Sequence, residues 1–105
     1  MLTTTTPEVL TKAIDYATAV LEDLENKFDH RRPLFSTAYQ IKFAASRFEW
    51  HTNNYLETHA RFIHPATAGD QREFYKNAYL TSQYKALAYA TVVKELVKNA
   101  GILDL

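Results

Sequence analysis

The chain has 105 residues with 12 basic and 12 acidic side chains, 47% hydrophobic residues, two glycines, three prolines and no cysteine. This length predicts one domain, residues 1–105. The lack of cysteine excludes disulfide-rich secreted mini-proteins, and we therefore expect a cytoplasmic protein. A net charge of zero gives no overall attraction to nucleic acid or membranes, and the longest apolar run, Ala86 to Ala90, predicts no membrane span.

Prolines and glycines divide the chain into three long segments of helix-forming residues, which predicts an all-α fold. The first segment runs from Pro7 to Phe28, with Thr6 placed to cap the helix and Pro7 at the tolerated first position. Its apolar residues recur every three or four positions, as expected for one buried stripe. This predicted stripe is Leu10, Ile14, Ala17, Leu21, Leu24 and Phe28.

The second segment begins at Pro33 or at Thr37 and ends before Pro65. A four-three spacing runs through it without interruption, which favours one continuous helix. Five successive poor helix formers at residues 50–54 oppose a continuous helix. A kink there would give a four-helix variant. The predicted buried stripe is Leu34, Ala38, Ile41, Ala45, Phe48, Thr52, Tyr55, His59 and Phe62.

The third segment opens with Asp70 and Glu73 at capping-box spacing and closes before Gly101. Its apolar residues, Phe74 among them, cover about half of the helix circumference, which predicts that this helix is the most buried of the three. A polar strip with Lys76, Gln83 and Lys94 is expected to face solvent. Thirty helical residues span about 45 Å, so we predict an elongated antiparallel three-helix bundle.

A second aromatic set lies on the middle segment, opposite its predicted buried stripe, and consists of Tyr39, Phe43 and Trp50. Polar residues surround the three rings, as around many interaction hot spots, and they include Arg47, Asn54 and Arg61. The face could serve the chain's own core, self-association or a foreign partner, and the sequence leaves all three open.

Charge is unevenly distributed, with a net charge of −4 over residues 1–30 and +3 over residues 31–64. The simplest interpretation is attraction between the rims of the first two helices. The alternative is an accessory nucleic-acid surface, in which Arg31, Arg32 and Lys42 would bind phosphates beside the aromatic rings.

No motif for catalysis, metal binding or a cofactor is present. The four histidines lack the Glu-x-x-His and His-Glu-x-x-His spacings, and two isolated glycines cannot build a phosphate-binding loop. His59 lies on the predicted core stripe, whereas His51 and His64 lie off it. We therefore expect a non-enzymatic, self-associating protein–protein interaction module that acts as an adaptor, an assembly factor or an inhibitor.

Overall fold

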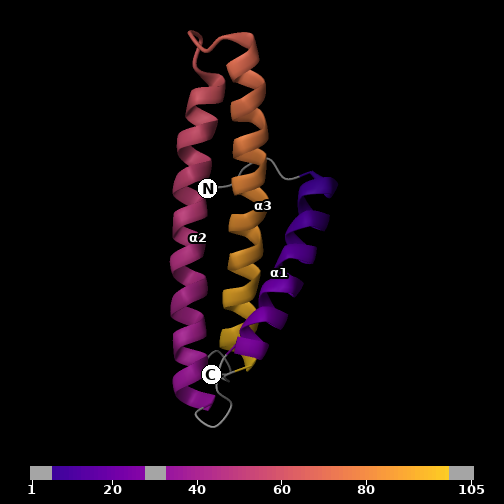
Figure 1. Cartoon of the computed structure of the whole chain (residues 1–105), viewed down its shortest axis with the longest axis vertical. Coiled ribbons are helices and arrows are strands. Elements are labelled where there is room, and N and C mark those ends of the chain that lie inside the picture. The colour runs from indigo at the N-terminus through magenta and orange to yellow at the C-terminus, as the bar shows by residue number, and fades with distance from the viewer. Residues whose placement is uncertain (1–5, 28–32, 100–105) are drawn as a thin grey trace.

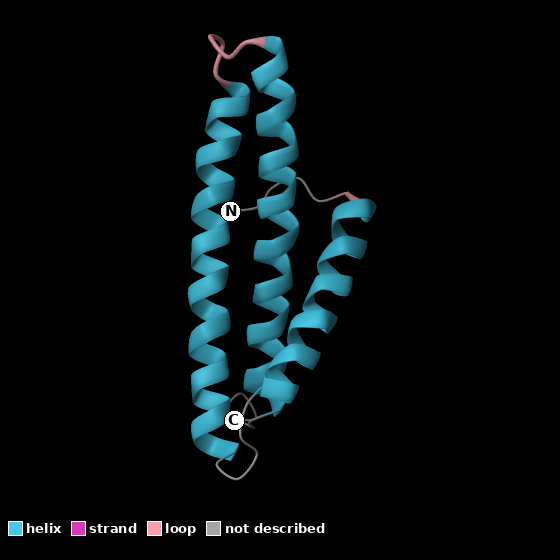
Figure 2. Ribbon diagram, in the orientation of Figure 1, coloured by secondary structure: helices cyan, strands magenta, loops and turns pink. Residues whose placement is uncertain are grey.

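The computed structural model describes residues 6–27 and 33–99, apart from the side chains of residues 25–27 and 33–37. These residues form three helices: α1 (Pro7–Lys27), α2 (Pro33–Ile63) and α3 (Gly69–Asn99) (Figure 1). The described part of the chain contains helices and loops and no strand (Figure 2). The predicted all-α three-helix bundle is confirmed. No helix described here is long and apolar enough to cross a membrane.

The bundle is elongated, as predicted. Its principal extents are 54 × 26 × 20 Å and its radius of gyration is 16.1 Å, against about 13 Å for a compact chain of this length. The shape arises because α2 and α3 form a hairpin of two 31-residue helices, whereas α1 has 21 residues. The shorter helix therefore leaves part of the hairpin uncovered.

The helix ends follow local capping chemistry. Thr6 caps α1 as predicted, since its Oγ1 accepts a hydrogen bond from the backbone N–H of Val9 at 3.2 Å. Of the two predicted starts of α2, Pro33 is the observed one. The cap predicted at Asp70 is wrong, because α3 begins at Gly69 and places Asp70 in its first turn, where its charge favours the positive end of the helix dipole.

The middle helix α2 is continuous from Pro33 to Ile63, so the kinked, four-helix variant is wrong. Residues 50–54 are poor helix formers, but α2 packs along α3, and such tertiary packing commonly outweighs local propensity. The buried residues Ala44, His51 and Tyr55 fix α2 against α3 below, within and above this stretch.

The third helix is the centre of the molecule, because α3 packs against both α1 and α2. It contributes six of the buried residues, as predicted for the most buried helix: Gln83, Ala86, Ala88, Tyr89, Val92 and Leu96. One detail of the prediction is wrong. Gln83, assigned to the solvent-facing strip, is only 1% exposed and lines the cavity between α1 and α3.

The buried faces of α1 and α2 are rotated from the predicted stripes. In α1, Leu10 and Ile14 are exposed and Val9 and Ala13 are buried in their place, whereas Ala17 and Leu24 are buried as predicted. In α2, Ala45 and Phe48 are exposed, whereas Ala44 and His51 are buried. Small side chains fill these contacts, since an alanine face lets two helix backbones approach closely.

The predicted rim attraction between α1 and α2 is not how α1 is held, because α1 packs chiefly on α3. At its carboxyl end α1 also approaches α2, where Gln40 Nε2 donates a hydrogen bond to the carbonyl oxygen of Leu24 at 3.4 Å. Towards its amino end α1 diverges from the hairpin (Figure 1). A cavity of about 610 Å³ lies between the diverging part of α1 and α3.

Candidate functional site

The three aromatic rings predicted on one face of α2 have different surroundings. Tyr39 and Trp50 are 52% and 54% exposed. Phe43 is half-buried and meets Tyr89 of α3 edge to face, with ring centroids 6.5 Å apart. Phe43 thus contributes to the core, while the side chains of Tyr39 and Trp50 are more than half exposed.

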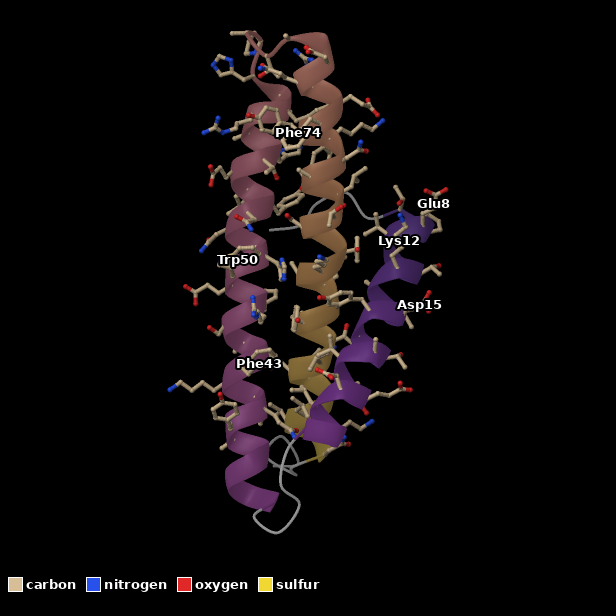
Figure 3. All side chains as sticks on the ribbon, viewed as in Figure 1. Glu8, Lys12, Asp15, Phe43, Trp50 and Phe74 are labelled. Carbon is tan, nitrogen blue, oxygen red and sulfur yellow. The ribbon has the colours of Figure 1, made fainter. Side chains whose placement is uncertain are left out.

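Trp50 lines a groove between α2 and α3, with a volume of about 420 Å³. We call it the α2–α3 groove. Along the hairpin, Trp50 lies between the levels of Phe43 and Phe74 (Figure 3). The α2 side of the groove is Trp50, His51 and Asn54, and the α3 side is Phe74, Asn77, Ala78, Thr81, Ser82 and Lys85.

The groove begins where α1 leaves the hairpin. Tyr16 of α1 meets Tyr89 at 5.7 Å between ring centroids, and Lys85 Nζ lies 5.6 Å from the centroid of the Tyr16 ring. Lys85 also lines the groove, so Tyr16 of α1 lies next to one end of it. Towards the α2–α3 turn, Phe74 is 65% exposed. The position of α1 therefore decides which part of the hairpin is covered.

Hydrogen bonds from Arg72 hold the turn that joins α2 to α3. The Arg72 guanidinium donates hydrogen bonds to the carbonyl oxygens of Phe62, His64 and Thr67, at 3.3 to 3.4 Å. Thr67 Oγ1 donates to the carbonyl oxygen of Arg61 at 2.7 Å. Backbone N–H groups of His64 and Thr67 also donate to the carbonyl oxygens of Arg61 and His64, so side chains and backbone together hold the end of α2 and the turn.

Trp50 rests on a buried support. Its ring meets the His51 ring edge to face with centroids 4.9 Å apart. His51 is 7% exposed, which corrects its predicted place away from the core. Burial lowers the pKa of His51 from 6.5, and the nearby charges of Lys85 and Arg47 lower it further. The imidazole is therefore neutral at neutral pH, and Trp50 packs against an uncharged ring.

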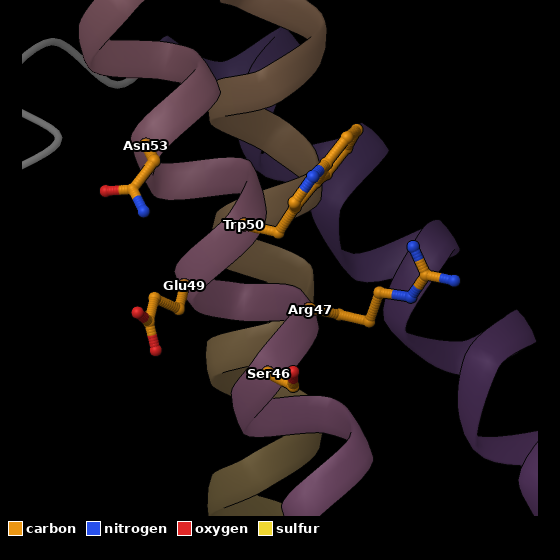
Figure 4. Close-up of a pocket in the computed structure, with 5 residues that line it drawn as sticks. All are labelled: Ser46, Arg47, Glu49, Trp50 and Asn53. Atoms are coloured by element: carbon orange, nitrogen blue, oxygen red, sulfur yellow. The ribbon is translucent and has the colours of Figure 1, made fainter.

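A second hollow of about 330 Å³ lies on the other side of Trp50, lined by Ser46, Arg47, Glu49, Trp50 and Asn53 (Figure 4). Arg47 and Trp50 extend to the same side of α2 (Figure 4). Trp50 thus forms the wall between two surface depressions, one of which carries both an arginine and a glutamate.

The three predicted rim residues, Asn54, Arg47 and Arg61, make different contacts. Asn54 lines the α2–α3 groove. The Arg47 guanidinium carbon lies 5.6 Å from the centroid of the Phe43 ring, which orients this side chain along α2. Arg61 pairs with Glu57 at 3.8 Å and lies 5.9 Å from the centroid of the Tyr75 ring, so its charge is already partly engaged.

Of the three basic residues predicted to bind nucleic acid, only Lys42 lies in the described part of the chain. Lys42 is exposed on α2 and does not line the α2–α3 groove. Arg31 and Arg32 lie outside the described residues. Within the described residues, no three histidine, aspartate or glutamate side chains are grouped as metal ligands.

The α3 side of the groove was not predicted. The sequence placed Phe74 on the broad apolar face of α3, where it could not be distinguished from a core residue. The signal that identifies it is the mismatch in length between α1 and the hairpin, since a short first helix cannot cover both ends of two longer ones.

Comparison of the chain with protein-family models, with curated proteins and with solved structures gave no significant match.

Proposed function

We propose that this chain is a non-enzymatic helical protein–protein interaction module that self-associates, and that the α2–α3 groove is its contact surface. An adaptor, an assembly factor or an inhibitor of a larger protein would each act through such a surface. The proposal rests on one observation: two large aromatic side chains, Trp50 and Phe74, are more than half exposed and line the same groove.

Exposure of Trp50 and Phe74 to water is energetically unfavourable. Full burial of a large apolar side chain is worth about 1.5 to 3 kcal/mol relative to full exposure, so two half-exposed rings leave a substantial part of this free energy unused. The surrounding amides and hydroxyls of Asn54, Asn77 and Ser82 can form hydrogen bonds around a buried centre. An apolar centre within a polar rim is the usual anatomy of a protein interface.

Binding would work by insertion of a partner's apolar side chains against Trp50, with the polar residues fixing the register. Trp50 suits this anchoring role because His51 supports its ring from below. Arg47 is placed beside Trp50 and can form a bidentate pair with a carboxylate of the partner.

A protein partner explains the charges of this face better than nucleic acid does. Glu49 shares a hollow with Arg47, and Glu57 pairs with Arg61, so the positive charges are interrupted by carboxylates. A phosphate backbone favours an uninterrupted positive track.

The emission of Trp50, the single tryptophan of the chain, tests the proposal directly. We expect red-shifted, quenchable emission at low protein concentration, and a blue shift that accompanies an increase in mass as the concentration rises. Blue-shifted emission in a monomer, or red-shifted emission at every concentration with no increase in mass, would contradict the proposal.

Salt dependence separates this function from the nucleic-acid alternative. Titration with a labelled single-stranded oligonucleotide at low salt should give no saturable binding. Binding that saturates and then weakens about a thousandfold or more between 50 and 200 mM salt would assign the function to nucleic acid instead.

A further inference from the structure

We propose that the α2–α3 groove of one copy is filled by the outer face of α1 from a second copy, with the same contact made in the reverse direction. This inference rests on the proposed function and specifies its partner. The assembly is a two-fold dimer with two identical groove-to-helix contacts.

The outer face of α1 has apolar side chains that the described part of the chain leaves largely exposed. Leu10 and Ile14 are 47% and 62% exposed and lie one helical turn apart, so they form a short stripe. Beside them, Thr11 and Thr18 donate their hydroxyl protons to the carbonyl oxygens of Pro7 and Ile14, each at 3.0 Å. Because these donors are satisfied internally, covering this face would leave no hydroxyl proton without an acceptor.

Charge complementarity favours this occupant. On α1 the exposed acidic residues Glu8, Asp15 and Glu22 outnumber the exposed Lys12. Lys85 is the one charged residue among those that line the α2–α3 groove, whereas the hollow across Trp50 holds both Arg47 and Glu49. A groove whose charged lining residue is a lysine attracts an acidic helix and helps to orient it.

The chain already places α1 against this hairpin once. At the carboxyl end of α1, Leu24 is buried and its carbonyl oxygen accepts a hydrogen bond from Gln40 of α2. Tyr16 meets Tyr89 below the groove. The groove is the continuation of the surface that α1 occupies within its own chain, and a second α1 would extend that coverage towards Phe74.

A two-fold axis pairs the groove and the α1 face of each copy with those of the other copy. Each copy has one groove and one exposed α1 face, so a two-fold axis satisfies both at once and leaves neither exposed. The same contact repeated without closure would give an open chain of copies, and a mass that stops at two chains distinguishes the proposed dimer from it.

Two variants and their mixture test the proposal. Ile14→Lys removes the helix half of each contact and Trp50→Ala removes the groove half, so each variant alone should dimerise about tenfold or more weakly than the parent chain. In an equimolar mixture, the groove of the Ile14→Lys chain can accept α1 of the Trp50→Ala chain. The mixture should therefore form a heterodimer with one intact contact.

Fluorescence reads the mixture without ambiguity, because only the Ile14→Lys chain retains a tryptophan. We expect its emission to shift to the blue as the Trp50→Ala chain is added. Leu56→Lys is the matched control, since Leu56 is 48% exposed on α2 and does not line the groove. This control should dimerise like the parent chain. Far-UV circular dichroism checks that each variant is folded, and Phe74→Ala provides a second groove variant.

The outcomes separate this inference from the proposed function. If Trp50→Ala abolishes dimerisation but Ile14→Lys does not, the contact is groove to groove; the present inference is then wrong and the proposed function stands. If the parent chain dimerises but mixing the two variants gives no blue shift, α1 does not fill the groove of the second copy; the present inference is again wrong and the proposed function stands. If the parent chain stays monomeric with exposed Trp50, both are wrong.

Discussion

His51 of α2 stacks face to face on Tyr89 of α3, with ring centroids 5.5 Å apart and ring planes 12° apart. Trp50 meets the edge of the same imidazole, and Tyr16 of α1 meets Tyr89 from the other direction. The exposed ring of the α2–α3 groove is therefore the last member of an aromatic chain that crosses all three helices. Substitutions of Tyr16, Tyr89 or His51 are therefore expected to alter the packing of Trp50 in the groove.

The stability of the fold should decrease in acid because of His51. Burial, with the charges of Lys85 and Arg47, lowers the pKa of this histidine in the folded chain below the unfolded value of 6.5. As the pH falls through 6.5, the unfolded chain gains a proton that the folded chain does not, so the free energy of unfolding falls until the folded pKa is reached. Urea unfolding at pH 7.5 and pH 5.5 measures this loss.

The substitution His51→Phe keeps an aromatic ring against Tyr89 and removes the titration. We expect a smaller loss of stability between pH 7.5 and pH 5.5 in this variant than in the parent chain. An unchanged acid dependence in His51→Phe would show that the buried imidazole is not its source.

Tyr89 predicts a loss of stability in alkali. Burial, followed by a hydrogen bond with Tyr16, raises the pKa of the Tyr89 hydroxyl from 10.0 to about 12. Above pH 10 the unfolded chain loses this proton while the folded chain keeps it, so the stabilisation is lost as the pH rises towards 12. Tyr89→Phe should cost about 1 kcal/mol at neutral pH and lose less stability than the parent between pH 9 and pH 11. Equal alkaline losses in both chains would contradict the assignment.

Two leucines of α1 test the rotated buried face. Leu24 is 4% exposed and Leu10 is 47% exposed, although both lie on the stripe predicted from the sequence. Leu24→Ala should lower the free energy of unfolding by about 2 to 5 kcal/mol because it leaves a cavity. Leu10→Ala should lower it by less than about 1 kcal/mol at a concentration where the chain is monomeric. Equal losses in the free energy of unfolding would show that Leu10 is buried as the predicted stripe requires, and would contradict the rotated face.

The ends and number of the helices were predictable because they depend on local chemistry. Thr6 as a cap and proline at the start of a helix act on neighbouring backbone groups, whatever the rest of the chain does. The continuity of α2 was also readable from the unbroken spacing of its apolar residues, since a break would have shifted their phase.

The buried faces were less predictable because they depend on how the helices cross. A four-three spacing fits two adjacent stripes on one helix, and the sequence favoured the stripe with the larger side chains, Leu10 and Ile14. The structure buries Val9 and Ala13 in place of Leu10 and Ile14 and keeps the predicted Ala17 and Leu24, because close approach to α3 favours small residues.

The candidate site was half predictable for the same reason. Trp50 and Asn54 were identified from α2 alone, as large and polar side chains on a face away from the predicted core. Phe74 and Lys85 came from α3, whose broad apolar surface gives no sign of which part α1 covers. The part of α3 that α1 covers belongs to the core, and the part that α1 leaves uncovered lines the groove. The two parts can therefore be distinguished only from the position of α1.

Sedimentation equilibrium of the parent chain beside Trp50→Ala and Leu56→Ala tests the central claim most directly. We predict that the parent and Leu56→Ala reach about twice the 12.1 kDa chain mass as concentration rises, whereas Trp50→Ala stays at the mass of one chain with its helical signal intact. The same mass for all three proteins at every concentration would contradict the account, since Trp50 would then contribute nothing to assembly.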